Sequence, residues 1–262
     1  MTASMPVGPL AIEYRLDAAQ PEAEALAPLV FLHEGLGCVG LWRGFPDAVR
    51  DGLGGPATLV YSRPGYGHST VVTEPRSPTY MHDEALDILP AILAAVGFER
   101  PLLIGHSDGA SIALIFAGAG HAVAGLALLS PHVFVEERSI QGIAAARAAY
   151  RTTDLPERLG RYHTDPDATF RGWNDIWLSP EFRSWNIEAS VAGIEAPMLV
   201  VQEDGDEYGT LAQLDRIEAG VKGPTSRLVL ADCGHSPQRD QEAAVIEAIA
   251  AFVTGLSQER MD

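Results

Sequence analysis

The stretch PLLIGHSDGASIALIFAGA, from Pro101 to Ala119, decides the fold of this chain of 262 residues. Its first residues, Pro101–His106, form an apolar run of strand length, and its second half, Ala110–Gly118, has the small apolar residues of a buried helix. A short turn centred on Ser107 joins the two, with a glycine two residues before it and another two residues after it. Such a tight strand-to-helix turn strains its central residue and exposes the side chain, so Ser107 is a candidate nucleophile.

Segments of strand length alternate with helical patterns along the rest of the chain. The strand candidates are nearly continuous in Val, Leu and Ile, which is typical of a parallel sheet buried on both faces. They are Pro28–Glu34, Ala57–Arg63, Pro101–His106, Val123–Pro131, Pro197–Glu203 and Ser226–Asp232. Helical patterns cover Met81–Phe98, where Pro90 is expected to cause a kink, and Gln241–Val253. The sequence therefore predicts an α/β fold, a mostly parallel central sheet flanked by helices, with an antiparallel edge strand over Gly8–Asp17.

The alternation is interrupted between residues 132 and 193, where the chain becomes helical and aromatic. Trp173, Trp177 and Trp185, three of the four tryptophans, lie in this segment. We interpret residues 132–193 as an inserted helical cap, which divides the core into residues 1–131 and 194–262. The alternative interpretation is an ordinary pair of surface helices.

The composition limits the classes of partner and the cellular compartment. A hydrophobic fraction of 47% predicts a globular protein, and a net charge of −17 disfavours binding to nucleic acid or to an anionic membrane. Cys38 and Cys233 are expected to be reduced thiols, as in the cytosol, and Cys38 to serve packing. The opening residues lack the pattern of a signal peptide, and no apolar run has the length of a membrane helix. We therefore expect a cytoplasmic protein that uses no cofactor and no metal.

A serine nucleophile needs a base, and the tripeptide Gly-His-Ser at residues 234–236 supplies one. His235 follows the strand candidate that ends near residue 232, so it is expected at the same sheet edge as Ser107. Ser236 and Pro237 have the pattern of a helix N-cap and first helical position. An earlier Gly-His-Ser copy, at residues 67–69, lies in a loop rich in Gly and Pro, and its His68 and Ser69 are interpreted as turn residues.

The base in turn needs a carboxylate that fixes its tautomer. The loop after the strand candidate at 197–203 offers Glu203, Asp204, Asp206 and Glu207. We favour Asp206, because Gly205 permits a tight turn before it, and Asp204 is the alternative. A solvated acidic loop without a catalytic role is also compatible with a chain of this charge.

Two backbone N–H groups are expected to stabilise a tetrahedral oxyanion. One belongs to Asp108, directly after the nucleophile. The second should come from the glycine-rich loop after the first core strand, where Gly35 is favoured and Leu36 is the alternative. His33 and His106 are expected to hydrogen-bond within the loops near the site.

The motifs HEGLG, RPGYGHS, GHSDGAS, EDGDEYG and DCGHS occur in this order, and with them the chain resembles the α/β-hydrolase superfamily over nearly its whole length. It is most similar to cap-bearing bacterial serine hydrolases. The resemblance implies a Ser107–Asp206–His235 triad and an oxyanion hole formed by Gly35 and Asp108. Two motifs depart from the family pattern: His33-Glu34-Gly35 replaces the usual His-Gly, and the acid turn contains both Asp204 and Asp206.

A serine at this turn predicts acyl chemistry on a small or medium carboxylic ester. Aromatic side chains of the cap are expected to shape the pocket, and about half of them should face the substrate: Phe170, Trp173, Trp177, Phe182 and Trp185. The alternatives are a hydrolase of C–C bonds, a thioesterase, or a ligand receptor on a hydrolase scaffold with slow turnover. The expected partner is a small-molecule ester, with neither nucleic acid nor membrane, and a homodimer is compatible with the sequence.

Overall fold

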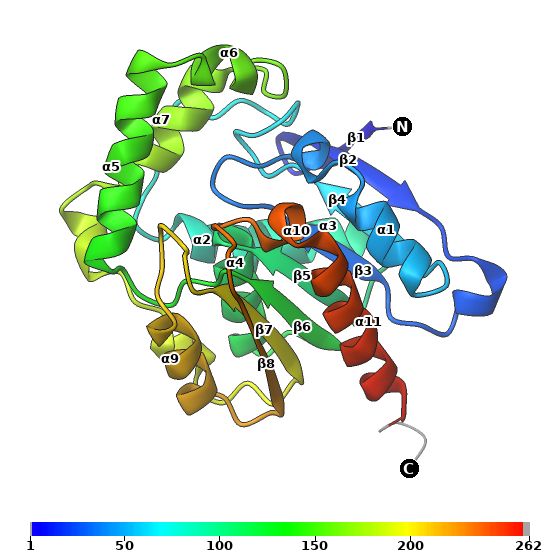
Figure 1. Ribbon diagram of the computed structural model, residues 1–262. Coiled ribbons are helices and arrows are strands. Elements are labelled where there is room, and N and C mark those ends of the chain that lie inside the picture. The colour runs from blue at the N-terminus through cyan, green and yellow to red at the C-terminus, as the bar shows by residue number, and fades with distance from the viewer. Residues whose placement is uncertain (1, 259–262) are drawn as a thin grey trace.

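The computed structural model describes residues 2–258 and contains one eight-stranded sheet (Figure 1). The strand order is β1-β2-β4-β3-β5-β6-β7-β8, and the strands from β4 to β8 run parallel to one another. The strands are β1 Ala3–Val7, β2 Leu10–Asp17, β3 Leu29–Leu32, β4 Thr58–Tyr61, β5 Leu102–His106, β6 Gly125–Leu129, β7 Met198–Glu203 and β8 Thr225–Leu230. The expected α/β fold with a mostly parallel sheet is confirmed.

The N-terminal edge of the sheet is an antiparallel hairpin rather than the single strand expected from the sequence. β2 is antiparallel to its neighbour β4, in agreement with the expected antiparallel strand, and β1 pairs with β2 through a turn in which Gly8 has φ +57°. The sequence did not indicate β1, because Pro6 disfavours a strand. Pro6 is tolerated here because β1 is an edge strand, where a missing N–H costs no ladder hydrogen bond.

Helices cover both faces of the sheet and bury two apolar clusters. On one face, α1 (Phe45–Gly52) and α11 (Glu242–Gln258) contribute Phe45, Val49, Val245 and Ile249 to the core. The other face is covered by α3 (Leu89–Val96), α4 (Asp108–Gly118) and α9 (Ala212–Gly220). This layering puts the carboxyl ends of β3, β5, β6, β7 and β8 at one edge, where the intervening loops meet.

The helical pattern over residues 81–98 is interrupted before Pro90. It begins as α2 (Tyr80–Asp83), passes through a π-helical turn at Glu84–Ile88, and continues as α3. Proline has no N–H to donate to the carbonyl four residues earlier, so a regular helix cannot continue through this point. A wider turn accommodates the missing hydrogen bond.

The segment between β6 and β7 is mostly helical. It contains α5 (Glu137–Thr152), α6 (Leu155–Leu159), α7 (Pro166–Trp177), a 3-10 turn at Glu181–Ser184 and α8 (Glu188–Val191). In Figure 1, α5, α6 and α7 lie together at the upper left, and α2 and α10 (Pro237–Asp240) are drawn between them and the sheet. By contrast α8 packs on α4, where a Cβ on Gly118 would collide with the carbonyl of Ser190. Among the described residues, 2–258, there is no helix of the length and hydrophobicity that crossing a membrane requires.

Candidate active site

Ser107 occupies a strained turn between β5 and α4. Its φ of 54° and ψ of −117° lie in a region that non-glycine residues rarely adopt, and its N–H donates to the carbonyl of Leu129 at 2.9 Å. Both neighbouring glycines are required by packing. A Cβ on Gly105 would collide with the backbone of α4, and a Cβ on Gly109 with the carbonyl of Leu32. The close approach of strand and helix therefore explains the Gly-x-Ser-x-Gly pattern.

The structure brings Ser107, His235 and Asp206 into one hydrogen-bonded row. His235 Nε2 lies 2.9 Å from Ser107 Oγ, and His235 Nδ1 lies 2.9 Å from both carboxylate oxygens of Asp206. A carboxylate only accepts, so Nδ1 carries the proton and donates to Asp206. Nε2 is then the free acceptor for the Ser107 hydroxyl, which is the tautomer that a general base requires.

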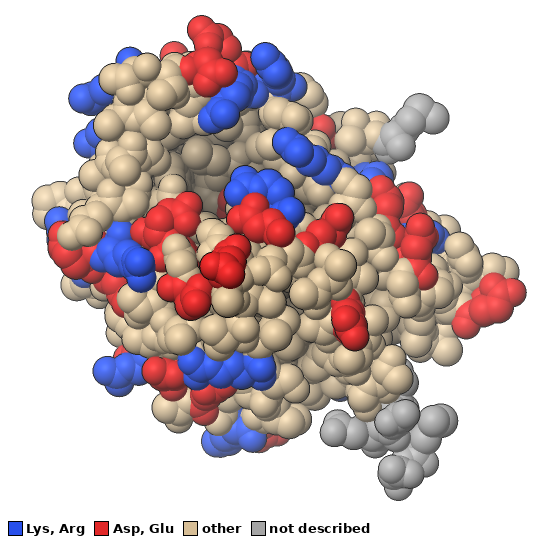
Figure 2. All heavy atoms as spheres, in the orientation of Figure 1, with Lys and Arg blue, Asp and Glu red and all other residues tan. Residues whose placement is uncertain are grey.

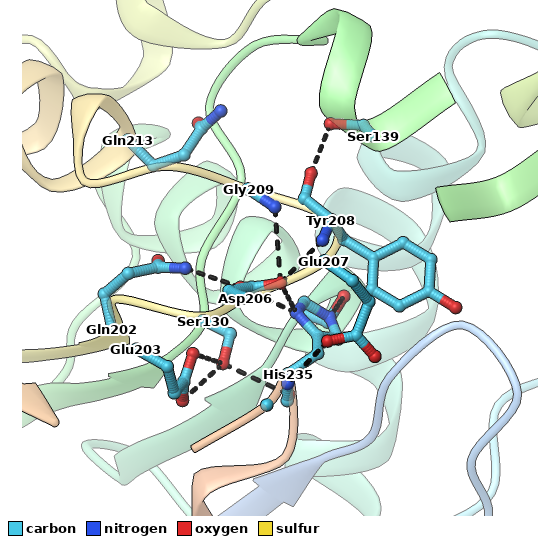
Figure 3. Close-up of polar contacts among 12 residues, drawn as sticks. Ser130, Ser139, Gln202, Glu203, Asp206, Glu207, Tyr208, Gly209, Gln213 and His235 are labelled. Atoms are coloured by element: carbon cyan, nitrogen blue, oxygen red, sulfur yellow. Dashed lines mark hydrogen bonds and ion pairs between the residues drawn. The ribbon is translucent and has the colours of Figure 1, made fainter. Parts of the chain in front are cut away.

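Asp206 is fully buried and receives several hydrogen bonds besides that of His235 (Figure 3). The N–H of Tyr208 donates to it at 2.7 Å, and the Gln202 amide donates to its other oxygen. Burial alone would raise the pKa of Asp206, but the charge of His235 and the hydrogen bonds from His235 and Tyr208 outweigh it and lower the pKa from 3.8 to about 2. Asp206 is thus an ionised partner for the imidazole, whereas Asp204 is exposed and does not contact it.

A second row of groups holds the backbone of His235. Its carbonyl accepts from His106 Nε2 at 2.6 Å and from Ser130 Oγ at 3.3 Å. Ser130 also contacts both carboxyl oxygens of the buried Glu203 at 3.0 Å (Figure 3). Burial, and then the negative charge of Asp206, raise the pKa of Glu203 from 4.5 to about 8. Glu203 is therefore largely protonated at neutral pH and adds little negative charge beside Asp206.

The loop after β3 borders the same cavity as Ser107. Gly35 and Leu36 of this loop line the cavity together with Ser107, His235 and Asp108, the first residue of α4. Gly35 must be glycine because a Cβ there would overlap the indole ring of Trp173. A histidine of the helical segment also holds the loop, because His163 Nε2 donates to the Leu36 carbonyl at 3.0 Å.

Arg63, which the sequence analysis did not select, hydrogen-bonds to the backbone of this loop. Its guanidinium is buried and donates to the carbonyl of Glu34 at 2.8 Å and to that of His33 at 3.3 Å. The peptide that joins Glu34 to Gly35 is trans, so its carbonyl and the Gly35 N–H point in opposite directions. With the carbonyl directed at Arg63, the N–H of Gly35 is directed away from it. The strand-end position of Arg63 was the available signal.

The side chain of Asp108 is held by contacts with Tyr80 and Arg63. It is fully buried and accepts from the Tyr80 hydroxyl at 2.7 Å, with Arg63 at 3.7 Å. Tyr80 in turn accepts from the indole N–H of Trp177 at 3.0 Å. This chain of contacts joins α7 of the helical segment to the residue that follows Ser107.

The cavity next to Ser107 has a volume of about 240 Å³ and is walled by α5 and α7. Of the predicted aromatic residues, Trp173 and Trp177 line it. Phe170, Phe182 and Trp185 do not belong to its lining. Phe170 stacks on Tyr150 with ring centroids 3.8 Å apart, and Phe182 stacks on Trp185 at 5.2 Å. These three rings pack the helical segment itself, a role that a sequence pattern of aromatic residues does not distinguish from contact with a ligand.

Several further residues line the cavity that the sequence analysis did not expect to contact a substrate, although Glu207 was among the candidates for the orienting acid. They are His132, Ser139, Ile143, Glu207, Tyr208 and Arg239. His132 lies in the loop just after β6, which ends at Leu129, so the rule that ligands gather at the carboxyl ends of strands could have indicated it. Glu34, Glu207 and Arg239 carry charge beside the cavity. Figure 2 shows acidic and basic side chains around a recess in this face of the molecule.

His68 and Ser69 of the first Gly-His-Ser copy, and Ser236 of the copy that contains His235, make structural contacts. Ser69 Oγ donates to the carbonyl of Ser62 at 2.6 Å, and the His68 N–H donates to Glu13 at 3.0 Å, as expected of turn residues. Ser236 stands at the N-cap position of α10 with Pro237 at the first helical position, as expected. Its hydroxyl makes no capping hydrogen bond, however, and its carbonyl accepts from the Arg239 N–H at 2.9 Å.

Neither cysteine competes with Ser107 as a nucleophile. Cys38 and Cys233 are buried free thiols, and burial raises the pKa of each to about 12. Both are therefore protonated at neutral pH and unreactive. Within residues 2–258, no three His, Cys, Asp or Glu side chains are grouped so that they could hold a metal ion.

The fold and the arrangement at the strand ends define the class of protein. A model of the alpha/beta hydrolase family matches residues 29–248. The chain belongs to the alpha/beta hydrolase family. No curated protein sequence matches it.

Solved structures of similar fold extend over nearly the whole chain. A proline iminopeptidase of Mycobacterium smegmatis is 17% identical, with 99% of this chain and 100% of that chain covered and a TM-score of 0.71. An enol-lactonase from Burkholderia xenovorans is 18% identical, with 96% and 100% covered and a TM-score of 0.73. A meta-cleavage product hydrolase from Pseudomonas fluorescens is 14% identical, with 97% of both chains covered and a TM-score of 0.71. At such identities the similarity shows the fold alone.

Proposed function

We propose that the protein is a serine hydrolase that cleaves a small or medium, uncharged carboxylic ester through an acyl-enzyme. The observation that carries the proposal is the pair of 2.9 Å contacts that join Ser107, His235 and Asp206 in the order hydroxyl, imidazole, carboxylate. Nucleophile, base and orienting acid are the three parts that serine acyl transfer requires.

The first half of the reaction forms the acyl-enzyme. Ser107 Oγ attacks the ester carbonyl carbon while its proton passes to His235 Nε2. The resulting oxyanion accepts hydrogen bonds from the N–H groups of Asp108 and Gly35, the two donors proposed for the oxyanion hole. When the tetrahedral intermediate collapses, His235 returns the proton to the leaving alcohol oxygen.

The second half releases the acid. A water molecule attacks the acyl carbon and gives its proton to His235, and a second tetrahedral intermediate expels Ser107 Oγ, which recovers the proton. Throughout, the ionised Asp206 holds His235 in the required tautomer and stabilises the imidazolium.

We propose that residues 132–193 act as a cap that shapes the substrate pocket. Trp173 and Trp177, on α7, and Ile143, on α5, contribute apolar surface to the cavity. A volume of about 240 Å³ favours a small or medium substrate over a long-chain lipid. The two buried thiols are compatible with a reducing cytoplasm as the site of action.

The proposal is tested with a panel of an ester, a thioester and a vinylogous diketone, with Ser107→Ala as the blank. We expect multiple turnovers of para-nitrophenyl butanoate, lowered about 10⁶-fold in Ser107→Ala. Ser226→Ala, which removes an exposed hydroxyl on β8, is the matched control and should keep wild-type turnover. Turnover of the thioester or the diketone alone would redirect the proposal to those reactions, and a single slow event with no further turnover would favour a receptor.

A further inference from the structure

The imidazole of His132 has no hydrogen-bond partner within the described part of the chain, although it lies in the wall of the cavity. It is 2% exposed, and its Nδ1 is buried without a donor or acceptor nearby. Only its backbone is anchored, through the carbonyl that accepts from Ser111 Oγ at 2.6 Å. Buried polar side chains are nearly always hydrogen-bonded, so an unpaired one beside a substrate cavity requires an explanation.

The position of the ring relates it to the reacting groups. Its centroid lies 5.6 Å from that of His235 and 5.5 Å from the ring of Trp177. His132 therefore lies near both the base and the indole of Trp177, and all three rings line the cavity. A substrate bonded at Ser107 would extend past this ring.

His132 is an uncharged group in this environment. Burial, and then the positive charge of His235, lower its pKa from 6.5 to about 3. A neutral imidazole has one N–H donor and one acceptor nitrogen. An N–H buried without an acceptor costs more than an unused lone pair, so Nδ1 carries the lone pair and Nε2 carries the hydrogen.

We infer that His132 is a specificity-determining residue whose Nε2–H donates to a second, uncharged carbonyl oxygen of the substrate, which makes the preferred substrate an ester bearing a ketone. The inference rests on the proposed hydrolase function. An uncharged oxygen is favoured over a carboxylate because Glu34 and Glu207 line the same cavity. Arg239 lines it too, but its charge is paired with Asp240 at 2.9 Å. An apolar side chain at this position would fill the space without an unpaired nitrogen, so the donor has a use only when a ligand supplies the acceptor.

The test compares esters of equal shape that differ in one oxygen. Ethyl levulinate is compared with ethyl isocaproate for a ketone on the acyl side. Acetonyl butanoate is compared with isobutyl butanoate for a ketone on the alcohol side. In at least one pair we expect wild-type kcat/KM to be about tenfold higher for the ketone, the effect of one hydrogen bond in a buried site.

Substitutions at the same position separate hydrogen bonding from shape. His132→Leu should abolish the ketone preference, and His132→Gln, whose amide N–H can replace Nε2–H, should retain most of it. Ile143→Ala alters the cavity wall without removing a donor and should keep the preference. Equal rates for both members of both pairs in the wild type, or a preference that survives in His132→Leu, would overturn the inference.

A binding measurement keeps the test independent of turnover. In Ser107→Ala labelled with ¹⁵N-histidine, the ring nitrogens of His132 should report a neutral Nε2–H tautomer. Saturating ketone ester should shift the Nε2 signal, and the matched ketone-free ester should not. Failure of all esters to turn over would refute the hydrolase proposal, whereas an unchanged His132 signal with the bound ketone ester would refute only this inference.

Discussion

Arg63 Nη2 donates a hydrogen bond of 2.8 Å to the carbonyl oxygen of Glu34, the residue that precedes the proposed oxyanion donor Gly35. A cation on the carbonyl side of a peptide fixes the direction of its N–H and polarises it as a donor. Arg63 is not itself among the residues that line the cavity, so it acts through the backbone of the loop. It is a positioning residue for the proposed oxyanion hole.

Arg63→Lys should lower kcat by about ten- to a hundredfold with little change in KM, because a lysine keeps the charge but lacks the planar guanidinium whose Nη2 reaches both carbonyls. The affinity of a trifluoromethyl ketone, which forms an oxyanion with the serine, should fall by the same factor as kcat/KM. A KM for the ester that rises by the same factor would instead indicate that ground-state binding is weakened by a general loss of structure. Arg15→Lys, at an exposed ion pair with Asp47, serves as the control.

Asp206→Asn should lower kcat about 10⁴-fold. The amide N–H can donate to Nδ1 and so favour the wrong tautomer of His235, and the neutral amide cannot stabilise the imidazolium. Asp204→Asn should retain activity within about twofold, as expected for an exposed surface substitution. Steady-state rates of ester hydrolysis by the two variants at one pH show which carboxylate orients His235. A larger effect of Asp204→Asn would show that the acid has been assigned to the wrong residue.

Gly35→Ala should lower kcat/KM about a hundredfold, because the added methyl group occupies the position of the Trp173 ring and displaces the proposed donor. The double variant Gly35→Ala/Trp173→Ala should recover part of that loss. The two substitutions are thus expected to be non-additive. Gly44→Ala, where a methyl group meets open space, should have no comparable effect.

Glu203→Gln should change how stability depends on pH. The pKa of Glu203 is raised from 4.5 to about 8 in the folded protein, so between these values the folded state holds a proton that the unfolded state has lost. Folding stability from this group is complete below pH 4.5 and decreases as pH rises to about 8, by up to about 1.4 kcal/mol per pH unit.

The glutamine variant lacks this decrease, so its free energy of unfolding should exceed that of the wild type at pH 8, with the difference shrinking toward pH 5. Urea denaturation at a series of pH values measures it. Asp204→Asn removes a carboxylate from an exposed neighbouring position and should leave the slope unchanged. Parallel pH profiles for wild type and Glu203→Gln would show that Glu203 does not retain its proton.

The fold could be predicted from the sequence because its strongest signals are local. Continuous apolar runs and the Gly-x-Ser-x-Gly turn specify parallel strands and a strand-to-helix junction, each within a few residues. The order of Ser107, Asp206 and His235 along the chain similarly indicated which loops meet at one sheet edge. The hairpin strand β1 gave no such signal, because its pairing with β2 depends on an edge position that only the assembled sheet defines.

The supporting residues of the site could not be predicted in the same way. Arg63 and Tyr80 act through contacts with a backbone carbonyl and a buried carboxylate far away in the chain, and no short motif encodes such a contact. The sequence also could not show which aromatic residues of the helical segment border the cavity. Trp173 and Phe170 lie one turn apart on the same side of α7. Only Trp173 borders the cavity, because Phe170 stacks on Tyr150 instead.

The charges around the cavity also bear on how a reaction there would finish. An ester arrives uncharged, and its hydrolysis leaves a carboxylate. Glu34 and Glu207 border the cavity, and the positive charge of Arg239 is engaged by Asp240 at 2.9 Å. In the proposed ester hydrolysis these carboxylates would repel the anionic product but not the neutral substrate, which would limit inhibition by the product.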